Sequence, residues 1–314
     1  MTTFIQNAFE QEPTLKALHQ WSLQHQADDP IIYAKPINGG LTNRCWQVSA
    51  QCGRQYIWRP HSPFITALSV SRSNEFCVLK ALQPYEIAPD PETLIVENGQ
   101  EIGLLVEWLS GCVLSETDSS QTQIQDNVIA CLAQLHQIQI KQENPIRTFE
   151  YAKLIEHYWQ ALPAELHTAD AAKRFEWFAS SSQQLDLVTS QIAAPCLCHF
   201  DLGDYNIIQT KEKNLKVIDW EYAAIANPIL DVAISALAGE FDLDTCIQTY
   251  ASHFTAENID IQVWQTIALQ WIPYLHYMML LWYQLSFAEY GRASDQAAIE
   301  LLNKQSSTYA DHFS

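Results

Sequence analysis

The chain has 314 residues, 48% of them hydrophobic, and its 36 acidic against 17 basic residues give a formal net charge of −19 at pH 7. This length and composition allow a full hydrophobic core and two lobes. The charge argues against a nucleic-acid partner, because a phosphate backbone would be repelled and no cluster of Lys and Arg offsets the repulsion. It favours cationic ligands instead.

The N-terminal segment has neither a basic region nor a long apolar run, so we expect no signal peptide and a cytoplasmic protein. The eight cysteines are then expected to be reduced and to act as small buried hydrophobic residues. Cys196 and Cys198 with His199 have the residue types of a zinc site. Their spacing lacks the CxxC form and no second ligand pair is visible, so we do not predict a metal–thiolate site.

The first third of the chain predicts a small antiparallel sheet with one helix. Residues 1 to about 30 carry apolar residues near helical spacing, and Pro30 ends this helical segment. Alternating apolar residues, with turn signals at 51–54 and at Asn98-Gly99, then indicate strands joined by hairpins. The expected strands cover residues 31–36, 45–48, 55–59, 94–96 and 102–108, and a helix is expected over 71–83.

After Gly111 the pattern becomes mainly helical. We therefore predict an α+β protein of two lobes, with the boundary near residue 108: an N-terminal lobe of residues 1–107 and a C-terminal lobe of residues 108–314. No internal repeat is visible. Helices are expected at 120–138, 150–161, 170–190 and 241–312, with a strand–loop–strand at 196–219.

Residues 261–288 contain no Asp, Glu, Lys or Arg, which raises the question of a membrane span. Several Gln residues, Pro273 and His276 interrupt the segment, so a lipid-facing helix is not expected. Buried or groove-lining helices fit this composition better.

The stretch from 198 to 222 carries the strongest chemical signal. Asp201 stands five residues before Asn206, which places a general base and a metal ligand on one loop. Asp219 follows an apolar run and supplies a second metal ligand from a neighbouring strand. This spacing is typical of phosphoryl transfer, in which Asp201 accepts the proton of the substrate hydroxyl while Asn206 and Asp219 hold Mg²⁺. His199 is expected to hold this loop by hydrogen bonds rather than to act as the base.

A second candidate element is the loop that contains Gly39, Gly40, Thr42 and Asn43. Two glycines let backbone amides approach phosphate oxygens, and the two polar side chains add short donors. An ordinary hairpin turn explains the same residues. The loop is not a Walker A motif, because the Gly-Lys-Ser/Thr ending is absent.

Three further residues match positions that bind nucleotide in kinases. Arg59 closes a strand and Glu75 lies on the next helix, so the two can pair as the cation that holds the α- and β-phosphates and the acid that orients it. Glu107 lies in the segment 104–111, where the hinge of a two-lobed kinase would bind adenine through its backbone. A buried strand with an exit turn explains that segment equally well.

The catalytic-loop pattern HxDxxxxN and the run Val-Ile-Asp-Trp-Glu-Tyr-Ala resemble the choline kinase and aminoglycoside phosphotransferase superfamily. Within it, the segments Gly-Gly-Leu-Thr-Asn-Arg-Cys-Trp and Tyr-Ile-Trp-Arg-Pro are most similar to those of bacterial thiamine kinases and bacterial choline kinases. The resemblance covers about residues 35 to 290. It implies a protein-kinase-like fold, ATP and Mg²⁺ as cofactors, and the roles given above for Asp201, Asn206, Asp219, Arg59 and Glu75.

The resemblance also places Glu221 and Asp231 at acidic positions near the active site. Many relatives have His and Pro where this chain has Gly203 and Asp204, a departure that leaves the residues of the chemistry intact. The aromatic-rich C-terminal part contains Trp271 and Trp282, and some of its rings are expected to form a cation–π wall, while most pack in the core.

These observations favour an ATP-dependent kinase that phosphorylates the hydroxyl of a small cationic metabolite, thiamine ahead of choline. The alternatives are an aminoglycoside-type antibiotic kinase and a catalytically silent kinase-like binding protein. The identity of the alcohol, the use of ATP or GTP and the oligomeric state are left open by the sequence.

Overall fold

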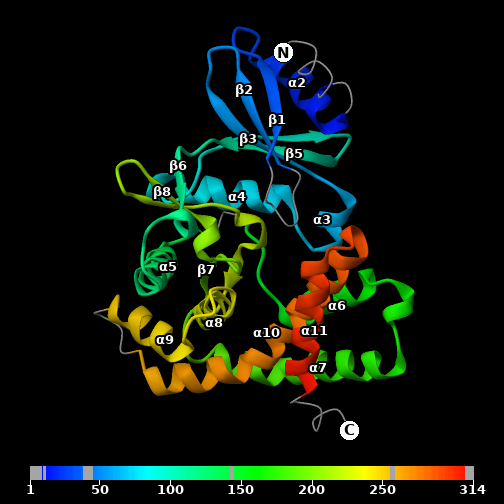
Figure 1. Cartoon of the computed structure of the whole chain (residues 1–314), viewed down its shortest axis with the longest axis vertical. Coiled ribbons are helices and arrows are strands. Elements are labelled where there is room, and N and C mark those ends of the chain that lie inside the picture. The colour runs from blue at the N-terminus through cyan, green and yellow to red at the C-terminus, as the bar shows by residue number, and fades with distance from the viewer. Residues whose placement is uncertain (1–8, 10–11, 38–44, 142–144, 255–258, 308–314) are drawn as a thin grey trace.

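The computed structural model describes residues 9, 12–37, 45–141, 145–254 and 259–307 (Figure 1). A small sheet-containing lobe lies at one end of the molecule, and a larger, mainly helical lobe lies at the other (Figure 1). The predicted α+β, kinase-like architecture is confirmed. The predicted phosphate loop with Gly39, Gly40, Thr42 and Asn43 lies outside the described residues.

The N-terminal lobe is built on a five-stranded antiparallel sheet of order β1-β2-β3-β5-β4. All five strands were expected from the sequence. One face of the sheet is covered by the first described helix, whose Leu15 and Leu18 pack with Trp58 in a small separate core. The elements are α2 (Pro13–His25), β1 (Ile31–Pro36), β2 (Trp46–Ala50), β3 (Gln55–Pro60), β4 (Pro91–Glu97) and β5 (Gln100–Glu107).

The expected helix of this lobe is α4 (Arg72–Leu82), which the side chain of Ser71 caps by accepting from the amide of Asn74. A short helix, α3 (Pro63–Ala67), precedes it and was not predicted. The buried side of α4, including Val78 and Leu79, belongs to the same hydrophobic cluster as the C-terminal helices. The two lobes therefore share one continuous core on this side.

The C-terminal lobe consists of helices around two small sheets. Its first sheet has the order β6-β8-β9, and its second pairs β7 with β10. We place the lobe boundary after Glu107, where β5 ends and the chain leaves the large sheet. The helices are α5 (Gln121–His136), α6 (Tyr151–Ala161), α7 (Ala169–Thr189), α8 (Pro228–Ala238), α9 (Leu243–Ser252), α10 (Ile261–Tyr290) and α11 (Ala293–Ser307), and the strands are β6 (Gly111–Val113), β7 (Cys196–Cys198), β8 (Ile207–Thr210), β9 (Leu215–Val217) and β10 (Ala224–Ala226).

Helix α8 was not predicted, and its burial explains why. Asn227 caps it and Pro228 occupies its first turn, which are ordinary start signals. Nearly every side chain from Pro228 to Ala236 is buried, so the segment has no polar face and no helical periodicity to read. Its only charged residue, Asp231, becomes important below.

The uncharged segment 261–288 lies within the single helix α10, which contains Pro273 and is buried along one side, most continuously from Tyr274 to Met278. Among the described residues, no helix combines the length and the apolar character that crossing a membrane requires. The expected buried helix is therefore what the structure contains.

Candidate active site

The loop after β7 is held in place by Asp231 of α8. One carboxylate oxygen of Asp231 accepts from the amide of His199 at 2.7 Å, and the other accepts from the amide of Phe200 at 2.8 Å. Phe200 has a left-handed backbone conformation, with φ of 66°, which is unfavourable for a side chain of this size. The two hydrogen bonds and the stacking of Phe200 on Phe149, at 4.3 Å between ring centroids, stabilise this bend.

The ring of His199 links this loop to the segment that carries Asp219. Its Nδ1 accepts from the amide of Asp201 at 3.2 Å, so the ring proton must be on Nε2, which donates to the carbonyl of Ile218 at 3.0 Å. Burial lowers the pKa of His199 and keeps the ring neutral. His199 thus has the positioning role that the sequence indicated.

Both carboxylate oxygens of Asp201 are oriented by neighbours on the same loop. The Tyr205 hydroxyl donates to Oδ1 at 2.8 Å, and the Asn206 amide donates to Oδ2 at 3.1 Å. Gly203 makes this possible, because a Cβ at that position would overlap the Tyr205 ring. Asn206 also donates to the Asp201 carbonyl at 2.8 Å, so its own side-chain oxygen is the atom that can ligate a cation.

Asp201 has the electrostatic character of a proton acceptor. Burial, and then the negative charge of Asp219, raise the pKa of Asp201 to about 8, although the hydrogen bonds from Tyr205 and Asn206 oppose this. A general base works best when its pKa lies near the operating pH. The arrangement therefore suits a carboxylate that receives the proton of a hydroxyl.

A buried ion cluster lies next to this loop and contains two guanidinium groups and three carboxylates. Arg59 of β3 pairs with Glu75 of α4 at 2.7 Å, as the sequence predicted, and also with Asp219 and Glu221. Arg72 of α4 pairs with Glu75 at 2.6 Å and with Glu221 at 3.2 Å. Sequence reasoning missed Arg72, because nothing in its local pattern distinguishes it from a surface arginine.

Asp219 is the most exposed member of this ion cluster. Its side chain is 27% exposed, whereas those of Arg59 and Glu221 are 9% and 1% exposed. Asp219 also has a left-handed backbone, with φ of 66°, two residues after the end of β9. The cluster therefore leaves one carboxylate in a position to bind a ligand, and that carboxylate is the predicted metal ligand.

Three of the predicted substrate residues lie elsewhere than expected. Glu221 is buried in the ion cluster, and the carboxylate of Asp231 serves the catalytic loop, so neither carboxylate is turned to a substrate. Trp271 is fully buried and donates to the Thr189 hydroxyl at 2.8 Å. These contacts show that the three side chains support the fold around the site, and the prediction that they contact the substrate is corrected.

Trp282 is half-buried, unlike Trp271, and its indole donates to the hydroxyl of the half-buried Tyr222 at 2.8 Å, so its substrate role stays a prediction. Burial raises the pKa of Tyr222 and of Tyr283, and the negative charge of Asp201 contributes to both shifts. Tyr205 donates directly to Asp201, and the charge of Asp201 reaches Tyr222 and Tyr283. The sequence signal for Tyr205 and Tyr222 was their place inside the two strongest motifs.

Glu107 is exposed at the end of β5. Its amide donates to the Asp90 carbonyl at 2.9 Å, and its carboxylate accepts from the Asp90 amide at 3.2 Å. Its role at a nucleotide hinge remains a prediction.

The protein has a kinase-like fold, and Asp201, Asn206 and Asp219 form the arrangement that the sequence predicted for phosphoryl transfer. The model of the phosphotransferase enzyme family matches residues 34–269, and the chain therefore belongs to this family. The predicted resemblance and the prediction of an enzyme of the small-molecule kinase class are confirmed.

Named relatives act on several small alcohols. A thiamine kinase of Shigella boydii serotype 4 is 23% identical over 274 residues, which cover 86% of this chain and 90% of the relative. A probable ethanolamine kinase of Nematostella vectensis is 28% identical over 200 residues, which cover 60% of this chain and only 55% of that relative.

Solved structures agree on the fold. The choline kinase LicA from Streptococcus pneumoniae has a TM-score of 0.67 at 18% identity, over 95% of this chain and all of that chain. An AMP-bound spectinomycin phosphotransferase has a TM-score of 0.57 at 12% identity, over 91% of this chain and 94% of the other. At these identities the likeness concerns the fold alone.

The electrostatics of Asp201 predict a trade-off between stability and activity. Burial and the charge of Asp219 raise the pKa of Asp201 to about 8, so at neutral pH the folded state bears the cost of keeping this carboxyl protonated or charged. Asp201→Asn removes that cost, so in chelator-containing buffer at neutral pH the melting temperature should rise, by about 2–4 °C for each kcal/mol gained. Turnover should be lost. Glu212→Gln, which removes an exposed charge in the turn after β8, should leave the melting temperature unchanged. A melting temperature of the Asn variant at or below that of the parent protein would contradict this assignment.

Proposed function

We propose that this protein transfers the γ-phosphate of ATP to the hydroxyl of a small cationic alcohol, with thiamine favoured over choline. The observation that carries the proposal is the oriented carboxylate of Asp201, which lies beside Asn206 and within electrostatic reach of Asp219. A base next to two oxygen ligands is the arrangement that phosphoryl transfer to an alcohol requires.

Asn206 and Asp219 would hold Mg²⁺. Both offer oxygen atoms, which are the ligands that this cation prefers. Asn206 ends the short helical turn over residues 204–206, and Asp219 directly precedes the one over residues 220–222. When bound, the cation neutralises charge that develops on the transferring phosphate oxygens. Structural neighbours such as LicA were solved with AMP, which supports the use of a nucleotide.

Side chains of this protein carry out the proton transfer and position the two substrates. Asp201 accepts the proton of the alcohol and orients its oxygen, while Tyr205 and Asn206 prevent the carboxylate from rotating. Arg59, oriented by Glu75, would hold the phosphates, and the loop with Gly39, Gly40, Thr42 and Asn43 is predicted to bind them as well. Glu107 marks the predicted hinge for the adenine.

The rings near Asp201 explain the preference for a cation. Tyr205 donates to the base, Tyr222 and Tyr283 lie within electrostatic reach of it, and Trp282 donates to Tyr222. Aromatic faces of this kind attract quaternary or heteroaromatic cations. The net charge of −19 attracts the same ligands over a longer range. Thiamine is placed first because thiamine kinase relatives align over most of both chains.

A phosphotransfer assay tests the proposal. Purified protein with Mg-ATP is offered thiamine, choline, ethanolamine and kanamycin in parallel, and the phosphorylated product is detected directly. We expect product from thiamine or, in second place, from choline, and none from Asp201→Ala, which should still bind nucleotide. Phosphorylation of kanamycin alone would favour an antibiotic kinase, and full turnover by Asp201→Ala would remove this residue from the role of base.

A matched pair of tryptophan variants tests the assignment of the aromatic residues. Trp282→Leu should raise the KM for the cationic acceptor about tenfold, since a desolvated cation–π contact contributes about 1–2 kcal/mol, and should change the KM for ATP little. Trp271→Leu should instead lower the melting temperature, because loss of a buried indole costs about 2–4 kcal/mol. An acceptor KM that rises in Trp271→Leu and not in Trp282→Leu would reverse the assignment.

A further inference from the structure

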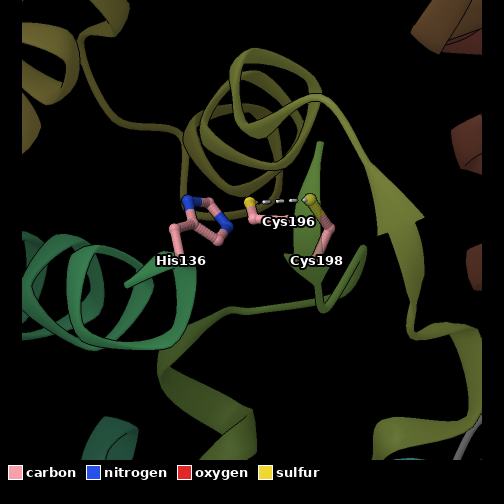
Figure 2. Close-up of side chains that lie close together, drawn as sticks. All are labelled: His136, Cys196 and Cys198. Carbon is pink, nitrogen blue, oxygen red and sulfur yellow. Dashed lines mark hydrogen bonds between the residues drawn. The ribbon is translucent and has the colours of Figure 1, made fainter. Parts of the chain in front are cut away.

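Three side chains of the types that ligate metals lie close together next to the start of the catalytic loop. His136 extends from the last turn of α5, and Cys196 and Cys198 extend from β7 (Figure 2). The possible ligand atoms of the three residues all lie within 4.8 Å of one another. Successive side chains of a strand alternate between its faces, so the CxC spacing places both sulfur atoms on the same side, towards the imidazole.

The separation of the two sulfur atoms is informative. They lie 4.0 Å apart. Two thiolates on one tetrahedral zinc ion, with bonds of about 2.3 Å, would be about 3.8 Å apart. A disulfide would need the atoms to approach to about 2.05 Å. The observed spacing is that of a thiol–thiol hydrogen bond, and it needs to change by only about 0.2 Å for the two sulfur atoms to share one ion.

We propose that His136, Cys196 and Cys198 form a binding site for a thiophilic divalent cation such as Zn²⁺. Two thiolates and an imidazole select zinc over magnesium, so this site is distinct from the oxygen ligands Asn206 and Asp219. Binding forms two metal–sulfur bonds and one metal–nitrogen bond, and it releases the two thiol protons to solvent.

The surroundings favour the thiolate of Cys196 but not that of Cys198, because burial raises the pKa of the Cys198 thiol well above its usual value, so metal binding must displace that proton. The hydrogen bond with Cys198 lowers the pKa of the Cys196 thiol although burial opposes this. Both ring nitrogens of His136 have partners: Nδ1 lies 2.9 Å from the Tyr250 hydroxyl and Nε2 lies 3.0 Å from Asp231. Metal binding exchanges one of these hydrogen bonds for a coordinate bond, and the other keeps the ring oriented.

The proposed metal site lies where it can stabilise the start of the catalytic loop. Asp231, which bonds to His136, also accepts from the amides of His199 and Phe200. Cys198 directly precedes this loop. A bound ion would thus brace the strand from which the catalytic loop departs. Sequence reasoning missed the site because it paired the cysteines with His199, whose ring is turned to Asp201 and Ile218 instead.

A metal competition titration tests the proposal. The full chain is reduced with a phosphine, freed of metal and titrated with Zn²⁺ against a chromophoric chelator. We expect the parent protein and Cys131→Ser, a buried cysteine on α5 outside the trio, to bind one Zn²⁺ per chain. Cys196→Ser and His136→Gln should bind it at least tenfold more weakly. Equal affinity in Cys196→Ser and the parent protein, or no stoichiometric binding by the parent protein, would overturn the site.

Cobalt substitution of the unmutated protein gives a second readout that does not depend on how well the variants fold. Co²⁺ bound by two thiolates produces an intense thiolate-to-metal charge-transfer absorption, which we expect in the parent protein and in Cys131→Ser. Saturation with Co²⁺ without that absorption would show that the cysteines are not ligands and would reject the proposal.

Discussion

The buried cluster of two arginines and three carboxylates is the interaction on which the site depends. Arg59, Arg72 and Glu75 come from the N-terminal lobe, and Asp219 and Glu221 come from the C-terminal lobe. Charges removed from water are costly, and each becomes tolerable only because several partners surround it. The cluster therefore requires the two lobes to meet in one register, and it fixes where Asp219 lies.

Hydrogen bonds to backbone groups connect Asp219 to the rest of the site. The carbonyl of Ile218, next to Asp219, accepts from His199, and Asp231 accepts from the amides of His199 and Phe200. Arg147 adds a further brace, because its guanidinium donates to the carbonyls of Ser69, Ala223 and Glu221. Asp201, Asp219 and Arg59, the predicted base, metal ligand and phosphate-side cation, are thus positioned by one connected set of buried polar contacts.

The sequence predicted the parts of the site that lie close together along the chain. Asp201 and Asn206 share a loop, and turn signals with alternating residues located the N-terminal strands. Side-chain direction could not be predicted in the same way. Trp271 and Trp282 lie on one helix, yet only the packing of neighbouring helices decides that the first is in the core and the second near the catalytic loop.

Acidic residues were misassigned for a related reason. A carboxylate near a catalytic motif looks the same in sequence whether it binds substrate or supports the backbone. Asp231 lies on a helix without a polar face, and Glu221 meets Arg72 only in the folded chain. The trio of His136, Cys196 and Cys198 likewise arises from two elements that only the tertiary fold brings together.

The most direct measurement of the central claim is the Mg²⁺ dependence of ATP binding, determined by calorimetry for the parent protein, Asp219→Asn and Glu212→Gln. Because Asp219 is the member of the ion cluster that is available to a ligand, Mg²⁺ should strengthen ATP binding in the parent protein and in Glu212→Gln. This gain should be lost in Asp219→Asn. An equal gain in all three proteins would contradict the role of the cluster in forming the nucleotide site.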